Sequence, residues 1–403
     1  MLLSPQQQKA VDHTGSPALI VAGAGSGKTR TLTARFSHLI HQGHDPRRIL
    51  AITFTNKAAD EMKSRLMEMT GLSLDHFQWV RTFHSACLMM LKRHCQRLGF
   101  VPPVQVLSVY QQDKLVKELC VKNNIEKKFA NRMLSLVSRA KNSGDPLKYF
   151  DIKPIIFNVR ISDIFQQYED RLKEMNCVDF DNILLKTRDL LRQHADVREG
   201  YQSWFSHILV DEYQDTNNLQ EDLTGLLLGP HRNLFCVGDD WQAVYGFRGS
   251  NIDHFLGFAH KYRDAKIFRL EENFRSADEI VQAANDMIDH NPDKMDKHCF
   301  SVKKGGVVEI YDFLSDSHEA EWVARRIKAM HRHGQGIAYD KMAVVYRTKF
   351  CSLPFEKIFR ALRVPYRLMG AQGFFERIEI LDINSYLSAA FFPNDDLSFE
   401  RVV

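Results

Sequence analysis

An apolar run followed by a glycine-rich loop lies near the start of the chain. Residues 18–21 read Ala-Leu-Ile-Val, and residues 22–29 read Ala-Gly-Ala-Gly-Ser-Gly-Lys-Thr. A strand that turns through such a loop into a helix places backbone N–H groups and a helix N-terminus around a polyphosphate. The segment therefore predicts a strand, a phosphate-binding loop and a helix in succession.

The last two loop residues have roles that their chemistry suggests. Lys28 is placed to reach the β- and γ-phosphates of a nucleoside triphosphate, and the Thr29 hydroxyl to hold Mg²⁺. The usual first glycine of the pattern is Ala22 here. We predict a nucleotide site formed by the whole loop, namely Ala22, Gly23, Ala24, Gly25, Ser26, Gly27, Lys28 and Thr29.

Short apolar segments alternate with helical stretches, which favours a parallel sheet with helices on both faces. Strands are predicted near 18–22, 49–54, 78–83, 207–212, 234–238 and 266–270. Between about 88 and 195 the pattern becomes helix-periodic. Helices are predicted there over 110–122, 129–141, 161–175 and 181–193. We therefore expect a helical domain inserted into an α/β core. A second α/β segment follows, with strands predicted near 307–313, 342–347 and 365–369.

The composition is that of an ordinary globular protein, with a net charge of +4 and 44% hydrophobic residues. No leader and no apolar run of membrane-spanning length is visible, so we expect a cytoplasmic protein without a membrane partner. Seven dispersed cysteines favour reduced thiols. Residues 91–160 carry 14 Lys/Arg and 5 Asp/Glu. This stretch is compatible with a polyanion partner or with a solvated helical surface.

Three further segments at predicted strand ends supply catalytic chemistry. Asp211 and Glu212 follow an apolar strand, where Asp211 is expected to hold Mg²⁺ and Glu212 to polarise the attacking water. Gln242 is able to contact both the γ-phosphate and water, and so to report nucleotide state. Arg275 is a candidate arginine finger that neutralises charge growing on the γ-phosphate.

Aromatic, hydroxyl and amide side chains also follow several strands. In an open α/β sheet the carboxyl ends of the strands line the ligand crevice. A loop with two aromatic residues and an arginine suits base stacking, worth roughly 1–3 kcal/mol per base. We therefore predict a single-strand channel formed by Phe54, Thr55, Asn56, Thr82, Phe83, His84, Tyr245, Phe247 and Arg248.

Taken together and in order, these motifs resemble those of superfamily 1 DNA helicases of the UvrD/Rep/PcrA type, from Leu3 to Val403. The resemblance implies that Gln7 reads adenine, that Arg30 lies near the nucleotide, and that Phe274 stacks on the base. Alanine at position 22 is usual in that family. Residues 345–348, with Arg347 as a DNA contact, and residues 374–377 resemble the start of a second motor domain.

The resemblance implies a P-loop, RecA-like architecture. Its expected domains are a first motor domain (1–88 and 196–276), an inserted helical domain (89–195), the start of a second motor domain (277–385) and of a further helical insertion (386–403). Two positions depart from the family: Trp241 stands where a small acidic residue is usual, and Lys349 where asparagine is frequent. The family's last two motifs are absent, so we expect a truncated form that unwinds weakly or not at all.

Three functions remain open at this stage. The first is an ATP- and Mg²⁺-dependent 3′-to-5′ DNA helicase, stimulated by single-stranded DNA, which acts in repair or replication restart and binds strands and junctions without sequence preference. The second is the motor portion of a helicase–nuclease. The third is a nucleotide-dependent DNA-binding module that never translocates. Lys28, Glu212 and Arg275 weigh against the third, because binding alone needs no water-activating glutamate.

Overall fold

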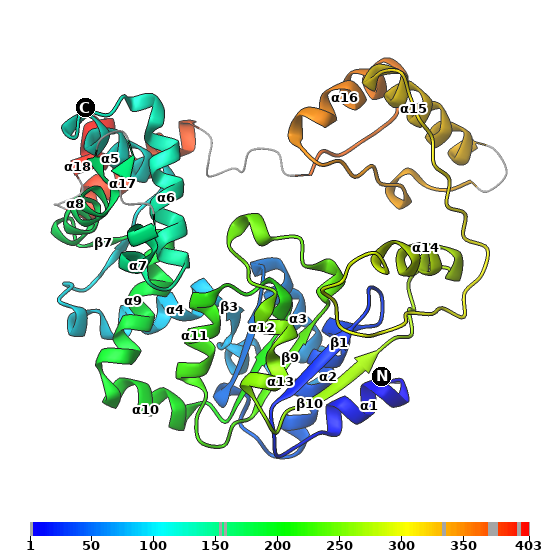
Figure 1. Ribbon diagram of the computed structural model, residues 1–403, viewed down its shortest axis with the longest axis horizontal. Helices are drawn as coiled ribbons and strands as arrows, with labels where there is room; N and C mark the ends of the chain where they lie inside the picture. Colours follow the sequence, from blue (N-terminus) through cyan, green and yellow to red (C-terminus); the bar gives the residue numbers. More distant parts are fainter. Residues whose placement is uncertain are drawn as a thin grey trace. The chain divides into compact units, whose positions relative to one another are not determined.

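The computed structural model describes residues 3–152, 155–156, 159–332, 336–369, 378–392 and 396–402 (Figure 1). The chain forms two compact units. The first comprises Met1–Val307 with Phe392–Ser398, and the second comprises Val308–Phe391 with Phe399–Val403.

A six-stranded sheet, parallel at every pairing, is the centre of the first unit. Its order is β10-β1-β9-β8-β2-β3. The strands are β1 (Ala18–Ala22), β2 (Ile49–Thr53), β3 (Val80–Thr82), β8 (His207–Val210), β9 (Leu234–Gly238) and β10 (Lys266–Leu270). These bounds confirm the predicted α/β class and each of the strands predicted for this part of the chain.

Helices cover both faces of the sheet, as the alternation of strands and helices predicted (Figure 1). Side chains on a strand point alternately to its two faces. In β1, Ile20 packs with the helices α2 (Lys28–His41) and α3 (Asn56–Thr70), whereas Leu19 and Val21 belong to the core on the opposite face. Helices that contribute to this second core are α4 (Phe83–His94), α9 (Phe180–Gln193), α10 (Ala195–Trp204), α11 (Asn218–Leu227), α12 (Asp253–Leu256) and α13 (Phe258–Lys261).

The segment between β3 and β8 is mostly helical and has a core of its own. Its further helices are α5 (Val109–Lys122), α6 (Ala130–Asn142), α7 (Pro146–Ile152) and α8 (Ile161–Glu174). Two short strand pairs, β4 (Gln105–Val106) with β7 (Cys177–Val178) and β5 (Ile155–Ile156) with β6 (Val159–Arg160), complete it. The four predicted helices are thus found within a residue or two of their expected ends.

The segment after β10 folds back onto the first unit. It contains α14 (Asp278–Ile288), and the backbone N–H of Phe300 donates to the carbonyl of Glu271. Asn285 donates its side-chain amide to the carbonyl of Cys299 at 2.7 Å. The compact unit therefore extends to Val307, whereas the sequence suggested a boundary after residue 276. The N-terminal helix α1 (Pro5–Asp12) also belongs to this unit.

The second unit holds α15 (Asp316–Arg332), α16 (Ser352–Ala361) and α17 (Ile378–Phe391), and α18 (Asp396–Val402) falls partly within it. Its small core contains Ala324, Phe359 and Val364. The three strands predicted here are not formed in the described residues. A strand requires a neighbour for its backbone hydrogen bonds. Without such pairing, Ile310 stays 94% exposed and Val345 93% exposed.

All seven cysteines are free thiols, and only Cys351 is exposed. Within the described ranges, no helix combines the length and the apolar character that crossing a membrane requires.

Candidate nucleotide and nucleic-acid site

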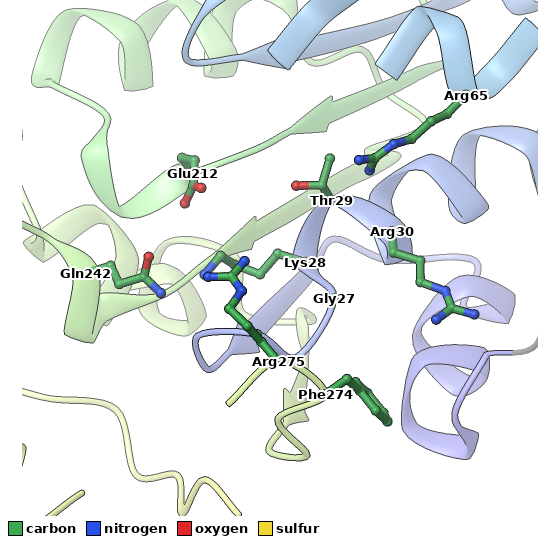
Figure 2. A pocket seen from close by; sticks show the side chains of 10 residues that line it. Gly27, Lys28, Thr29, Arg30, Arg65, Glu212, Gln242, Phe274 and Arg275 are labelled. Carbon is green, nitrogen blue, oxygen red and sulfur yellow. The ribbon is translucent and has the colours of Figure 1, made fainter. Parts of the chain in front are cut away.

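A cavity of about 360 Å³ opens where the carboxyl ends of the strands meet. Ten residues line it: Gly25, Gly27, Lys28, Thr29, Arg30, Arg65, Glu212, Gln242, Phe274 and Arg275. Figure 2 shows Glu212 and Gln242 at one end of this space, with Arg30 and Phe274 at the other. Lys28, Thr29 and Arg275 lie between these two ends, so the predicted phosphate-binding side chains and Phe274, which is expected to stack on the base, line one cavity.

The phosphate-binding loop is held by two side chains from outside it. Gly25 and Gly27 have φ of +70° and +87°, values that favour glycine. A Cβ on Gly25 would lie 2.6 Å from Asn273 Oδ1, and one on Gly27 would lie 2.7 Å from Gln7 Nε2. Asn273 donates to the carbonyl of Ala24 at 2.7 Å, and Gln7 to that of Ser26 at 2.8 Å. These glycines are therefore required both by conformation and by close approach.

Lys28 and Gln242 meet at one carboxylate. Lys28 Nζ lies 3.4 Å from Asp239 Oδ2, and Gln242 Nε2 donates to the same oxygen at 2.6 Å. The Asp239 side chain is 1% exposed. The backbone N–H of Asp239 donates to Gln214 Oε1, and Gln214 Nε2 donates to Glu212 at 2.9 Å. Asp239 is thus linked to three of the residues expected to act on the phosphates.

Asp211 and Thr29 form the predicted metal-binding pair. Burial, followed by the neighbouring Glu212 charge, raises the pKa of Asp211 to about 7, and a hydrogen bond with the Thr29 side chain opposes this rise. A carboxylate and a hydroxyl are oxygen ligands of the kind that Mg²⁺ prefers. The two side chains therefore fit a Mg²⁺ ion bound together with a nucleotide.

Glu212 has a strained backbone, with φ 49° and ψ 46° in the left-handed region. Residues other than glycine rarely adopt this conformation, and such strain gathers at functional sites. Here it coincides with the step from β8 into the following turn. The conformation directs the Glu212 side chain into the cavity, where Figure 2 shows it facing the Lys28 side of the space.

Asp211→Asn is expected to stabilise the protein at high pH. Because the folded pKa of Asp211 is raised above its unfolded value, ionisation of this carboxyl costs stability as pH rises from about 4 to about 7. In EDTA above pH 7, the variant should gain roughly 2–4 kcal/mol, and at pH 4 much less. Thermal unfolding at several pH values measures this, with the exposed Asp75→Asn as control. Equal midpoints of Asp211→Asn and wild type at pH 8 would contradict it.

Arg30 and Phe274 line the other end of the cavity, and Gln7 lies against Gly27 and Ser26 of the phosphate loop. Gln7 is 1% exposed and closes a capping box with Ser4 at the start of α1, so the helix fixes its side chain. Phe274 is 40% exposed, and its backbone N–H donates to the carbonyl of Gly25. The ring is therefore attached to the phosphate loop by its own backbone, in a place suited to contact a flat base.

Three of the aromatic residues that are predicted to contact single-stranded nucleic acid form a continuous cluster. The ring centroids of Phe54 and Tyr245 are 5.1 Å apart, and those of Tyr245 and Phe247 are 6.1 Å apart. Phe54 is 37% exposed and Phe247 63% exposed. Phe54 follows β2 and Tyr245 follows β9, so the cluster lies at the same edge of the sheet as the cavity.

The other residues predicted to contact single-stranded nucleic acid lie outside this aromatic cluster. Thr55 and Thr82 accept backbone N–H bonds at the starts of α3 and α4, and the Thr82 hydroxyl lies 3.5 Å from Asn56 Oδ1. Phe83 is only 8% exposed and belongs to the hydrophobic core, because it is the first residue of α4 and points inward. This placement argues against the predicted contact of Phe83 with a base.

His84 stacks on Phe180, with ring centroids 3.7 Å apart and an interplanar angle of 14°. Burial lowers the pKa of His84 to about 4, so it is neutral at pH 7. Phe180, the first residue of α9, is 56% exposed. The pair offers an apolar surface rather than a cation. Phe180 was not among the predicted contacts, because a single phenylalanine at a helix start has no distinguishing pattern.

Arg248 ends a short 3₁₀ turn, Gly246–Arg248. Arg347 is exposed in the second unit, and residues 374–377 lie outside the described part of the chain.

Sequence reasoning missed two residues of the nucleotide cavity and its support. Arg65 comes from α3 and lines the cavity, but nothing in its helical surroundings marks it. Asn273 lies in the segment quoted for Phe274 and Arg275, and its Oδ1 accepts the backbone N–H groups of Arg275 and Ser276. Its asparagine-turn character was the signal that could have identified it.

A parallel sheet with a phosphate loop at its carboxyl edge and an Asp-Glu pair on a neighbouring strand defines a P-loop nucleotide-binding protein. The chain matches the UvrD/REP helicase N-terminal domain over residues 3–263 and the UvrD-like helicase C-terminal domain over residues 268–403. It belongs to the UvrD/REP helicase family.

Relatives with similar sequences include two ATP-dependent DNA helicases named PcrA, from Staphylococcus epidermidis and Staphylococcus aureus. Each is 36% identical to this chain over 406 aligned residues, which cover all of the chain and 55% of the relative. The chain thus spans about half the length of these curated relatives.

Proposed function

We propose that this chain is the nucleotide- and strand-binding part of an ATP-dependent DNA helicase that moves 3′ to 5′ and hydrolyses ATP faster on single-stranded DNA. The observation that carries the proposal is the position of two sites on one sheet edge. A cavity with Lys28, Glu212 and Arg275 lies at the carboxyl ends of the strands, where the Phe54–Tyr245–Phe247 cluster also lies.

Five side chains of the site have a defined task in this proposal. Lys28 and Arg275 bind the phosphates and neutralise charge that develops on the γ-phosphate. Glu212 orients a water for in-line attack. Thr29 and Asp211 hold Mg²⁺, which when bound supplies further neutralisation of phosphate charge.

A short connection joins the phosphate end to the aromatic cluster. Gln242 lies on the 3₁₀ turn Asp240–Gln242, and Tyr245 follows three residues later. The backbone N–H of Val244 donates to the carbonyl of Gln242, which makes this connection tight. A change in the contacts of Gln242 is therefore transmitted to Tyr245 over a short distance. A ligand shifts a conformational equilibrium only if it binds the two conformations with unequal affinity. Through this turn, the conformation that ATP favours at Gln242 can differ from the nucleotide-free one in how Tyr245 contacts the DNA strand.

The relatives are named as DNA helicases, which favours DNA over RNA for this chain as well. We propose single strands and junctions, bound without sequence preference, as the nucleic-acid partner, and the bacterial cytoplasm as the location. DNA repair or replication restart is the proposed setting. Phosphate contacts dominate such binding, so affinity should fall as salt rises.

Phe247→Ala is expected to weaken binding of a single-stranded oligonucleotide by roughly 5- to 150-fold, the loss of one stacked base. The matched control is Trp204→Ala. Trp204 is 45% exposed and lies just before β8, at the opposite edge of the sheet. Fluorescence anisotropy with a labelled dT oligonucleotide measures both. Wild-type affinity in Phe247→Ala would show that the cluster does not hold the strand.

A further inference from the structure

A fully buried lysine lies behind the phosphate end of the cavity. Lys297, in the segment that follows α14, has a side chain that is 0% exposed. Its Nζ donates to Asp239 Oδ1 at 2.6 Å and to Asp240 Oδ1 at 2.5 Å. Both carboxylates are 1% exposed. A buried lysine is retained in proteins only when its charge is compensated, and here two carboxylates compensate it.

Asp239 is shared between this lysine and the residues of the cavity. Its Oδ1 accepts from Lys297 and from the backbone N–H of Trp241, whereas its Oδ2 faces Lys28 and accepts from Gln242. One side of the carboxylate is thus fixed by buried groups. The other side contacts the two residues that are expected to meet the phosphates.

The charges of this cluster balance only while Lys28 is part of it. Asp239 and Asp240 together carry two negative charges, and Lys28 and Lys297 carry two positive charges. The Lys28–Asp239 contact, at 3.4 Å, is the longest of the three ion pairs. When Lys28 turns towards a phosphate, the two buried carboxylates depend on Lys297 alone.

We infer that Lys297 is a positioning residue for nucleotide binding. It holds Asp239 in place when Lys28 leaves it, and it thereby keeps Gln242 attached to Asp239 Oδ2. Among the ion pairs of the described residues, loss of Lys297 leaves Asp239 paired with Lys28 alone and Asp240 unpaired, so release of Lys28 to the phosphates becomes costly. The inference rests on the proposed nucleotide site, and it adds a residue that lies outside the segments singled out in the sequence.

Trp241 has a role in the same arrangement. Lys297 Nζ lies 4.5 Å from the centroid of the Trp241 ring. An aromatic face attracts a cation, most strongly where water is excluded. The Trp241 ring therefore adds a favourable contact to the ammonium group beside those of the two carboxylates. Asp240 Oδ2 also accepts the backbone N–H of Met295 at 2.7 Å, which fixes the segment that presents Lys297.

The test compares Lys297→Met, Asp240→Asn and the double variant for equilibrium binding of ATPγS with Mg²⁺ by calorimetry. We expect Lys297→Met to weaken binding by roughly 10-fold or more, because it leaves a buried negative charge uncompensated. Asp240→Asn should bind at least as tightly as wild type. The double variant restores the charge balance of the wild-type cluster and should regain binding to within about threefold of wild type.

Recovery in the double variant shows that the loss in Lys297→Met comes from the uncompensated charge of Asp240, because the remaining Asp239 and Lys28 again balance. A change in KM without an equal change in kcat separates this effect from a general loss of structure. Steady-state kinetics should show the same pattern as a raised KM for ATP with a smaller change in kcat. Thermal midpoints identify a variant that fails to fold, and Asp240→Asn alone then tests the inference: weaker binding than wild type overturns it.

The controls separate this inference from the proposed function. Failure of the wild-type chain to bind ATPγS would overturn the nucleotide site itself. Normal binding by wild type, with equal affinity in a folded Lys297→Met, would overturn only the role of Lys297.

Discussion

Lys28→Ala is expected to lower ATP turnover by roughly 10³-fold, the effect of removing a charged group that stabilises the transferring phosphoryl. Lys28 Nζ lies in the cavity, 3.4 Å from the carboxylate of Asp239. Because Asp239 keeps Lys297 on its other oxygen, loss of Lys28 leaves no carboxylate of this cluster without a cation. The fold should therefore be preserved, and single-strand binding should remain.

The matched control is Arg47→Ala. Arg47 is an exposed cation just before β2, at the sheet edge opposite the cavity. The Arg47→Ala substitution removes one positive charge, as Lys28→Ala does, but at a site away from the cavity. ATP turnover should therefore stay at the wild-type level. Steady-state phosphate release measures both variants. Turnover in Lys28→Ala within a few-fold of wild type would contradict the placement of the phosphates at this loop.

Glu212→Gln is expected to separate binding from hydrolysis. Loss of a positioned carboxylate base lowers the chemical step by roughly 10²–10⁴-fold. Glutamine has the same shape and keeps an oxygen that can accept the 2.9 Å bond from Gln214. It also tolerates the left-handed backbone as well as glutamate does. ATP affinity should therefore change little while single-turnover hydrolysis nearly stops.

Glu68→Gln is the control for this variant, since Glu68 is an exposed glutamate on α3. Single-turnover assays, in which ATP is first bound to the protein and its hydrolysis is then followed, give the hydrolysis rate. Calorimetry gives the affinity for ATP. Hydrolysis at the wild-type rate, or loss of ATP binding in a folded Glu212→Gln, would show that Glu212 does not act on the attacking water. The two variants thus test different steps, because only Lys28→Ala should weaken nucleotide binding.

Local patterns predicted the sheet of the first unit and its inserted helices well. The six strands and the four long helices of the inserted segment have strong periodicity, and their residues are buried as the periodicity implied. The phosphate loop was predictable because its glycines directly follow the apolar strand in the sequence. Contiguity also made Asp211, Glu212 and Gln242 candidates, because the first two directly follow the buried strand β8 and Gln242 lies in the turn after β9.

Features that depend on distant parts of the chain were not predictable. Lys297 looks like a solvated lysine in a charged loop, yet it is fully buried because Asp239 and Asp240 approach it from β9. Phe83 follows a strand as the channel residues do, but the start of α4 turns it into the core. In the second unit, the apolar residues near 310 and 345 fit a strand pattern, but no strand pairs with them in the part of the chain that the structure describes.

The measurement that tests the central claim most directly is steady-state ATP hydrolysis by this chain, with and without single-stranded DNA, beside Lys28→Ala and Phe247→Ala. The account predicts hydrolysis that rises several-fold with DNA in wild type, no turnover above background in Lys28→Ala, and little rise in Phe247→Ala. Identical wild-type rates with and without saturating DNA, in a protein that binds both ligands, would contradict the claim that the cavity and the aromatic cluster work together.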